Sequence, residues 1–327
     1  MLFDELSGPK LIGIARLAAN SELLEAKRRV EYLEIEARSL ITKCTSPRMP
    51  FIWTVNPYRG CEFGCRYCYA RYTHEFMELH DPELFETRIF AKSFNAAAFR
   101  ADLARVPQQE SVWIGTATDP YQPAERRYGI TRQMLTVLAQ CKGRRIGITT
   151  KSDLVSRDAD LLREIARSNI VHVNMTITTL DEALARLLEP LAPRPSLRLG
   201  AIETLTAAGV RCTVLTHPVM PLINDSEASM DAVCGAAVRA GIVSFSAAPL
   251  FLKPCAKQVF LPFVERHFPH LFDKYQQLYA RRAYLTGEYP DRVRATVRRL
   301  IEKYGLKERG VADLPESWPA VRQMKLF

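Results

Sequence analysis

The stretch of sequence that decides the fold is FIWTVNPYRGCEFGCRYCYA, residues 51–70. Its first five residues, 51–55, form a short apolar run of the kind found in a strand that is covered on both faces. The loop that follows carries three cysteines within eight residues, Cys61, Cys65 and Cys68. Three thiolates on one tight loop can hold an iron–sulfur cluster or a zinc ion, so this stretch predicts a metal centre at the end of a strand.

Further apolar runs continue this pattern along the chain. They are residues 112–117, 146–150, 170–177, 210–219 and 242–248. Most are apolar on successive rather than alternate positions, which is typical of parallel strands buried on both faces. Helix signals separate them: Ser196 is an expected start with Gly209 as the end, and either Asp225 or Ser226 is an expected start with Gly241 as the end. Six strand–helix units predict an open, partial barrel or a doubly wound sheet, and both place the ligand site at the carboxyl edge.

The rest of the chain is expected to form additional segments around this core. A polar amphipathic helix is predicted over residues 21–40, with Ser21 as its N-cap. From about residue 258 the pattern becomes helical, with recurring aromatic residues that we interpret as a core stripe. The expected segments are an N-terminal helical extension (1–50), the barrel (51–257), a C-terminal helical region (258–309) and a linker with a tail (310–327).

Composition is that of an ordinary globular protein. Of the 327 residues, 47% are hydrophobic and 25% are charged, which argues against wholesale disorder. Lys and Arg outnumber Asp and Glu by 45 to 36, and the resulting net charge of +9 is compatible with a polyanionic partner. We recognise neither an apolar run long enough to span a membrane nor a secretory signal. The expectation is a cytoplasmic protein whose cysteines are ligands rather than disulfides.

The number of thiols in the loop bears on the kind of metal centre. A structural zinc site normally has four protein ligands, and the nearest further candidates are Cys44 and His74. Three ligands to a four-iron cluster instead leave one iron open, and an open iron is a reaction site. The residues alone therefore leave two alternatives, a catalytic iron–sulfur cluster and a structural zinc ion.

The cysteine motif resembles the signature of the radical S-adenosylmethionine (SAM) superfamily, with the aromatic residue Tyr67 directly before the third cysteine. The surrounding sequence is similar to the spore photoproduct lyase-like branch of that superfamily over about residues 30–305. The stretches that carry this similarity are residues 56–61, 68–71, 115–123, 149–152, 189–190 and 194–195.

The resemblance implies a fold, two cofactors and a reaction. The fold is of the α/β class, a partial (β/α)6 barrel of the TIM type. The cofactors are a [4Fe-4S] cluster bound by Cys61, Cys65 and Cys68, and SAM, bound to the open iron. One electron, supplied through an electron donor protein, would cleave SAM to methionine and a 5′-deoxyadenosyl radical that abstracts a hydrogen atom from the substrate.

The resemblance also indicates residues that contact SAM. Thr118 and Asp119 match the Ser/Thr–Asp pair of the branch, and Lys151 ends the third strand, where it can reach the SAM carboxylate. The alternatives are a turn role for Asp119 and a surface position for Lys151. Alternation places Asn174 and Thr176 on one face of the fourth strand, either near the ribose or in polar packing. The expected cofactor-binding residues are Tyr67, Thr118, Asp119, Lys151, Asn174 and Thr176.

The sequence departs from the lyase at the hydrogen atom donor. In the lyase a cysteine comes just before the Ser/Thr–Asp pair, whereas residues 115–117 here are Gly, Thr and Ala. The resemblance therefore does not extend to repair of the spore photoproduct itself. Tyr121 and Cys255 are the candidate catalytic residues that could replace this thiol. His217 is interpreted either as a pocket residue or as a core histidine.

Two features near the C-terminus bear on partners. Arginines gather at positions 281, 282, 292, 294, 298 and 299. They suit a phosphate backbone, and the alternative is a solvated helix face paired with Glu288 and Asp291. The last residues are Gln323, Met324, Lys325, Leu326 and Phe327. This tail resembles the peptide by which bacterial repair and replication proteins bind the sliding clamp, and the alternative is a packed terminus.

These observations favour one function and leave two alternatives. The leading interpretation is a lyase-like radical SAM enzyme that abstracts hydrogen from an unknown substrate, with DNA or another nucleic acid, in repair or modification, as the best candidate. The first alternative keeps the radical chemistry but directs it at a protein or a small molecule. The second is a zinc-stabilised nucleic-acid-binding module without catalysis.

Overall fold

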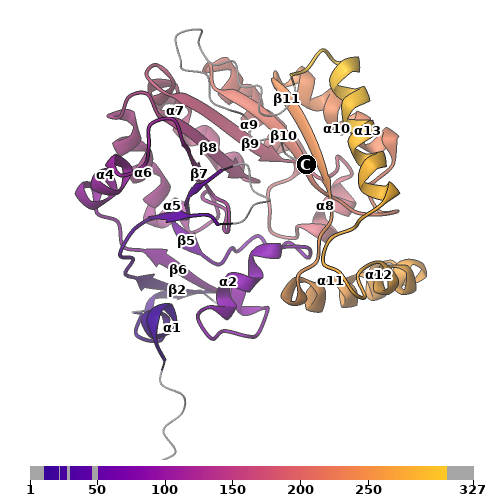
Figure 1. The fold of residues 1–327 in the computed structure, drawn as a ribbon, viewed down its shortest axis with the longest axis horizontal. Helices are drawn as coiled ribbons and strands as arrows, with labels where there is room; N and C mark the ends of the chain where they lie inside the picture. Colours follow the sequence, from indigo (N-terminus) through magenta and orange to yellow (C-terminus); the bar gives the residue numbers. More distant parts are fainter. Residues whose placement is uncertain (1–10, 22, 28–29, 46–50, 308–327) are drawn as a thin grey trace, which may run out of the picture.

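The computed structural model describes residues 11–21, 23–27, 30–45 and 51–307, and two β-sheets organise them (Figure 1). The larger sheet contains β3 (Ile41–Lys43), β4 (Trp53–Val55), β7 (Ser111–Ile114), β8 (Arg145–Thr150), β9 (Ile170–Thr176), β10 (Arg211–Val219) and β11 (Ser244–Pro249). Their spatial order is β11-β10-β9-β8-β7-β4-β3, with β3 antiparallel to β4 and the other neighbours parallel. Since β3 and β11 are the two edges of this sheet in the described part of the chain, the prediction of an open, partial barrel is confirmed.

Helices follow the barrel strands in the expected alternation. They include α4 (Ala96–Ala104), α6 (Ile130–Ala139), α7 (Ala159–Ala166), α8 (Glu182–Leu188), α9 (Pro195–Ala207) and α10 (Glu227–Arg239). Side chains cap two of them, because Asp181 accepts hydrogen bonds from the first backbone N–H groups of α8, and Ser226 does so for α10. These caps stabilise helix starts beyond the carboxyl edge of the sheet, where the loops of the candidate site also lie.

The two faces of the barrel strands differ in polarity. In β9, Val173 and Met175 are fully buried in the main hydrophobic core. Asn174 and Thr176 are also buried, but alternation along the strand places them on the opposite, inner face of the barrel. A polar inner face is what a barrel needs if it is to hold a polar ligand rather than a filled apolar core.

The smaller sheet corrects the expectation for the N-terminal region. Its order is β1-β2-β6-β5, with bounds β1 (Leu23–Lys27), β2 (Val30–Ile35), β6 (Arg88–Lys92) and β5 (Tyr58–Arg59). The helix predicted over residues 21–40 is therefore wrong, and the helix of this region is α1 (Gly13–Ala19). The reason is tertiary: β2 pairs in parallel with the distant β6, and this pairing buries Tyr32 and Ile35, whose aromatic and β-branched side chains suit a strand.

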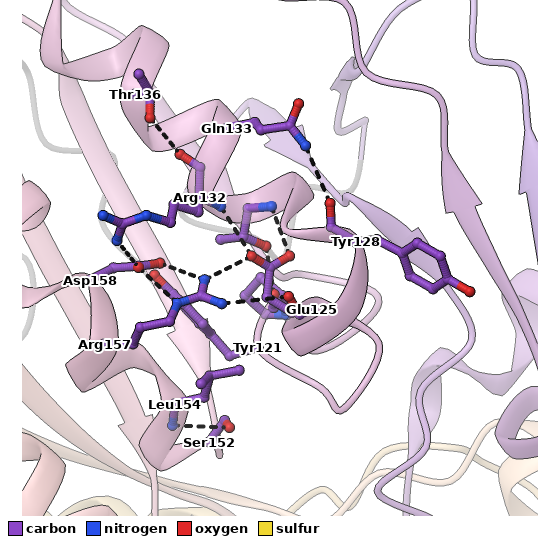
Figure 2. Close-up of polar contacts among 12 residues, drawn as sticks. Tyr121, Glu125, Tyr128, Arg132, Gln133, Thr136, Ser152, Leu154, Arg157 and Asp158 are labelled. Atoms are coloured by element: carbon purple, nitrogen blue, oxygen red, sulfur yellow. Dashed lines mark hydrogen bonds and ion pairs between the residues drawn. The ribbon is translucent and has the colours of Figure 1, made fainter.

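A buried ionic network connects the smaller sheet with the barrel. Glu125, in α5 (Glu125–Tyr128), accepts a hydrogen bond from the phenol of Tyr58 at 2.6 Å. It also accepts one from the guanidinium of Arg157 at 2.9 Å (Figure 2). Arg157 also donates to the buried carboxylate of Asp158 at 2.9 Å, and Arg132 pairs with the same carboxylate. Because each buried carboxylate faces a guanidinium, the charges offset one another's desolvation and hold the loop between β7 and α6 in place.

The C-terminal region is helical, as expected, with α11 (Pro254–His267), α12 (Phe272–Leu278) and α13 (Glu288–Lys303). In Figure 1, α13 lies along β11, and the two elements are in contact. The predicted core role is confirmed for Phe260, Tyr275 and Tyr279, which are buried in one cluster with Phe63 and Tyr67 of the cysteine loop, whereas Tyr284 is only half-buried. None of the helices in the described residues is long and apolar enough to cross a membrane.

The arginines of α13 make ion pairs. The pairs are Arg292–Asp225 (3.2 Å), Arg299–Glu227 (2.8 Å) and Arg294–Asp291. Of these, Arg294–Asp291 uses a partner that the alternative of a paired, solvated helix face names; the other two use Asp225, just before α10, and Glu227, its first residue. The predicted division of the chain after residues 50, 257 and 309 stays a prediction, and the linker and tail over 310–327 lie outside the described residues.

Candidate cofactor site

The cysteine loop leaves the carboxyl end of β4, passes through β5 and is tied to its surroundings by backbone hydrogen bonds. The N–H of Cys61 donates to the carbonyl of Phe85 at 2.8 Å, and the N–H of Arg66 donates to the carbonyl of Leu188 at 2.9 Å. Gly60 has φ +81°, and a Cβ there would lie 2.9 Å from the same Phe85 carbonyl oxygen. The loop therefore needs glycine at this position, both for its backbone conformation and for the close approach.

The three thiols of the loop lie in a common, buried electrostatic environment. Burial raises the pKa of all three, and that of Cys65 to about 12. The charges of Cys65 and Cys68 raise the pKa of Cys61 further, which reflects their proximity. Lys151 opposes the shift at Cys65, and Arg71 opposes it at Cys68. Binding of iron must therefore displace protons from these thiols, as metal binding to cysteine generally does.

Three thiols on one loop are a donor set that fits a four-iron cluster. A four-iron cluster takes each thiolate on a different iron. His74, one of the expected further zinc ligands, hydrogen-bonds the Arg88 carbonyl oxygen at 3.0 Å and lies against the rings of Phe85 and Phe90.

Tyr67 connects the cysteine loop to a buried ion pair that the sequence did not reveal. Its phenol donates to Glu189, whose carboxylate pairs with Arg198 at 2.5 Å. Arg198 also donates to the carbonyl of Thr176 at 2.9 Å. Burial alone would raise the pKa of Glu189, but Arg198 and Lys151 hold it below its ordinary value. The carboxylate is therefore ionised, and it joins the cysteine loop to the end of β9.

Lys151 lies beside the cysteine loop rather than out on the surface. Its Nζ is 5.6 Å from the centroid of the Tyr67 ring. Burial alone would lower its pKa, but the charges of Cys65 and Glu189 raise it above the ordinary value. The loop and the end of β8 thus present a charged ammonium group next to the three thiols.

Thr118 and Asp119 hold the ends of strands together. Asp119 accepts hydrogen bonds from the Thr150 hydroxyl and from the backbone N–H of Lys151, each at 2.7 Å, and so connects the ends of β7 and β8. Thr118 donates to the carbonyl oxygen of Gly60 at 2.5 Å. Gln122, which is not among the expected site residues, also holds the loop: its amide donates to the same carbonyl at 3.1 Å and its oxygen accepts from the N–H of Glu62 at 3.0 Å. Its place in the Thr–Asp–Pro–Tyr–Gln–Pro stretch was the signal.

Asn174 carries an unsatisfied amide on the inner face of the barrel. The residue is 1% exposed, and its Nδ2 is a buried donor without a hydrogen-bond partner among the described residues. In register, Asn174 lies beside Thr149 of β8 and Thr213 of β10. Thr176 lies on the same face, nearer to the carboxyl edge. A buried donor without a partner is costly unless a ligand or water satisfies it, so this position is suited to contact a ligand.

The candidate catalytic residues lie in different surroundings. Tyr121 is buried in the main core, near the Glu125–Asp158 network of Figure 2. Cys255 is buried in the first turn of α11, and its thiol interacts with Glu75 of α2 (Tyr72–Glu75). His217, near the end of β10, is 3.2 Å from the hydroxyl of Ser246. The structure thus does not gather these three residues into one group.

An aromatic wall, consisting of Tyr69, Phe251 and Tyr284, borders the third cysteine. The ring of Tyr69 is 5.2 Å from that of Phe251, which stacks on Tyr284 at 4.8 Å with an interplanar angle of 11°. Tyr69 follows Cys68 directly, and its phenol donates to the Thr116 carbonyl. Phe251 and Tyr284 are only half-buried, so this wall includes a surface that another planar group can reach.

Comparison with known families and proteins defines the class of this chain. Residues 55–232 match the model of the radical SAM superfamily. An uncharacterized protein of Mycobacterium tuberculosis is 36% identical over 279 residues, which cover 85% of this chain and 82% of the relative. An uncharacterized protein of Methanocaldococcus jannaschii is 26% identical over 203 residues, covering 61% of this chain and 71% of the relative. The chain belongs to the radical SAM superfamily, so it is an enzyme whose cofactors are a [4Fe-4S] cluster and SAM.

Solved structures of spore photoproduct lyase share the fold. One mutant of that enzyme superposes with a TM-score of 0.66 at 16% identity, covering 94% of this chain and 87% of the lyase. Another, described with bound AdoMet and dinucleoside spore photoproduct, gives a TM-score of 0.64 at 15% identity, covering 93% of this chain and 86% of the lyase. At this identity the comparison concerns the fold, and it agrees with the branch that the sequence resembles.

Proposed function

We propose that Cys61, Cys65 and Cys68 each bind one iron of the cluster and that SAM takes the fourth. When bound, these cofactors supply the reductive cleavage of SAM and a 5′-deoxyadenosyl radical that removes a hydrogen atom from the substrate. The observation that carries the proposal is the meeting of three thiols, one buried and two partly buried, with a charged lysine at the carboxyl end of a polar, open barrel.

The residues around the thiols would position SAM through complementary charge and hydrogen bonding. Lys151 is suited to the SAM carboxylate, because its ammonium is charged and already lies beside the loop. The spare amide of Asn174, with Thr176 nearer to the edge, is suited to hydroxyl groups of the ribose. Tyr67 would pack against the adenine, held in orientation by Glu189.

Thr118 and Asp119 would act mainly by positioning. Their hydrogen bonds hold the cysteine loop and the ends of β7 and β8 in register. A carboxylate has about four lone-pair sites, so Asp119, with its three donors, retains capacity to accept from the SAM ammonium.

Nucleic acid is the substrate class that we propose. The aromatic wall, made of Tyr69, Phe251 and Tyr284, offers rings on which bases can stack, and the net charge of +9 favours a polyanion. The lyase structures described with dinucleoside spore photoproduct belong to an enzyme of the same fold. Because no thiol stands at residues 115–117, we infer a reaction other than repair of that photoproduct, with Cys255 or Tyr121 as candidate hydrogen donors.

Two further partners complete the proposal. Radical SAM enzymes need an electron donor, for which a small redox protein is suited. A sliding clamp bound through residues 323–327 stays a prediction, because those residues lie outside the described ones. Deleting residues 323–327 should abolish co-elution with the clamp, and an intact protein that shows no clamp binding would remove that part of the proposal.

Anaerobic reconstitution tests the proposed function. The protein should become brown, hold about four irons per chain, and cleave SAM to 5′-deoxyadenosine with dithionite as reductant. Replacing Cys61, Cys65 and Cys68 together by Ala should abolish all three properties, whereas Cys141→Ala is the matched control. A colourless protein that holds one zinc and is inert toward SAM would contradict the proposal. Acceleration of SAM cleavage by DNA or RNA oligonucleotides, and not by peptides, supports the proposed substrate class.

A further inference from the structure

Arg59 and Lys92 project from the same face of the smaller sheet, next to the cysteine loop. In the antiparallel pairing of β5 with β6, Arg59 lies opposite Phe90, and Lys92 is two residues further along β6. Directly paired residues share a face, as do residues two apart on one strand. The two cations are therefore diagonal neighbours, with Cα atoms about 7–8 Å apart, as in antiparallel pairs generally.

Both cations are removed from water without a counter-charge. Lys92 is 7% exposed, and Arg59 is mostly buried. Over the described ranges of the chain, neither side chain makes a hydrogen bond or an ion pair with protein. Two other buried arginines behave differently, because Arg71 pairs with Glu86 and Arg198 with Glu189. Burying an unpaired charge is costly, and at its other two buried arginines the protein avoids that cost by pairing each with a carboxylate.

The charges around these cations do not supply the missing anion. Burial and the charge of Arg59 lower the pKa of Lys92 to about 7, so its amine is only partly protonated near neutral pH until an anion binds beside it. His74, on α2, is neutral, because burial and neighbouring arginines lower its pKa to about 4. The carboxylates of this end of the molecule have partners of their own: Glu31 with Arg88, Glu86 with Arg71, and Glu75 with the thiol of Cys255.

The two cations lie near the cofactor site, close to the cysteine loop and to α2. Arg59 comes two residues before Cys61, and its charge acts on the phenol of Tyr72 in α2. Lys253, the N-cap residue of α11, lies 3.5 Å above the ring of Tyr72 and adds a third cation. Figure 1 shows α2 between the smaller sheet and α11. An anion between Arg59 and Lys92 would thus lie near both the cysteine loop and a cation-capped aromatic ring.

We propose that Arg59 and Lys92 bind a phosphate group of the substrate, namely a backbone phosphate of a nucleic acid strand. The proposal rests on the proposed function, and it deepens it by naming the group that anchors the strand. A phosphate satisfies both cations at once, since guanidinium and ammonium groups are its usual partners. A base next to the anchored phosphate can then reach the aromatic faces beside the cysteine loop.

Binding measurements on the full chain without SAM test this inference. Binding of a labelled single-stranded oligonucleotide, followed by fluorescence anisotropy over a series of salt concentrations, should weaken about tenfold in Lys92→Gln. The slope of log affinity against log salt should fall by about one. Lys92→Arg keeps the charge and should retain affinity, and Lys142→Gln, at an exposed position, is the matched control. Wild-type affinity and slope in Lys92→Gln would overturn the proposal.

A second measurement separates the sources of phosphate. Inorganic phosphate, compared with chloride at equal ionic strength, should raise the thermal midpoint of the wild type but not that of Lys92→Met, whose apolar side chain suits burial. If phosphate or a mononucleotide stabilises the protein while oligonucleotide binding does not depend on Lys92, the nucleic-acid assignment is overturned. Equal phosphate stabilisation of both proteins would overturn the site itself. Iron content and SAM cleavage of the wild type decide the proposed function separately, since neither binding assay uses them.

Discussion

Replacing Glu189 by Gln should strongly destabilise the protein, because it leaves a buried guanidinium without its counter-charge. The side chains of Glu189 and Arg198 are each 1% exposed, and the charged atoms are 2.5 Å apart. Arg198 also donates to the carbonyls of Pro193 at 2.8 Å and Thr176 at 2.9 Å, so it is held in place and cannot turn toward water. Removing one partner of such a pair costs about 3–5 kcal/mol.

This cost is large against the total free energy of unfolding of a globular protein, about 5–15 kcal/mol. At about 2–4 °C per kcal/mol, it corresponds to a fall of roughly 6–20 °C in the thermal midpoint. The double variant Glu189→Met, Arg198→Met removes both charges. It should recover most of the loss, because burying an ion pair is itself costly and apolar residues of similar size replace it well.

Urea unfolding of the cluster-free protein, followed by circular dichroism, measures these free energies in a double-mutant cycle. Glu182→Gln is the matched control, since Glu182 is exposed and lies 3.9 Å from Arg194; its change should stay below about 1 kcal/mol. The reasoning is refuted if Glu189→Gln is also within about 1 kcal/mol of the wild type, or if the double variant is as unstable as the single one.

Three further outcomes follow from the same contacts. Arg198 and Lys151 hold the pKa of Glu189 below its ordinary value. The ionised carboxylate therefore stabilises the fold above about pH 4.3, and this contribution is lost as the pH falls through the lower pKa of the folded state. The urea midpoint of the wild type should drop in that acidic window, and that of the double variant Glu189→Met, Arg198→Met should drop less. Gly60→Ala should cost about 1–3 kcal/mol and lower iron loading, since the Cβ would meet the Phe85 carbonyl at a φ of +81°; full iron content would contradict this. Lys151→Met should weaken SAM binding at least about tenfold by equilibrium dialysis, as expected for a lost charge-assisted hydrogen bond, and a change below twofold would speak against its assigned role.

The barrel could be predicted because its strands carry their signal locally. The run over 112–114 is apolar on successive positions, and 170–177 alternates from residue 171 on, with Asn174 and Thr176 facing the polar barrel interior; both patterns can be recognised within one segment. The smaller sheet could not be predicted in this way. Residues 30–35 become a strand through pairing with 88–92, and a pattern read within one segment does not contain a partner so far along the chain.

The same difference between local signals and long-range contacts decides which residues of the candidate site could be predicted. The three cysteines are recognisable because their spacing within one loop is itself the signal. The hydrogen bond from Tyr67 to Glu189 spans 122 residues, and Glu189 appeared in the sequence only as part of a family-like dipeptide. Asp119 was expected to contact SAM, but the sequence did not indicate that its carboxylate also accepts three hydrogen bonds, from Thr150, Tyr121 and Lys151. Such roles depend on which strand ends become neighbours.

Hydrogen-bonding capacity on the inner side of the site is distributed unevenly, and this bears on what the site can bind. Most of the accepting capacity of the carboxylates is used: Asp119 accepts three hydrogen bonds, and Glu189 accepts from Tyr67 while pairing with Arg198. Donors with spare capacity remain, namely the ammonium of Lys151 and the amide of Asn174. Free donors of this kind favour ligands that carry acceptor oxygens, while the remaining lone pair of Asp119 is left for an ammonium group. The carboxylate and ribose oxygens of SAM meet that requirement, and so does a phosphate placed beside Arg59 and Lys92 at the substrate end.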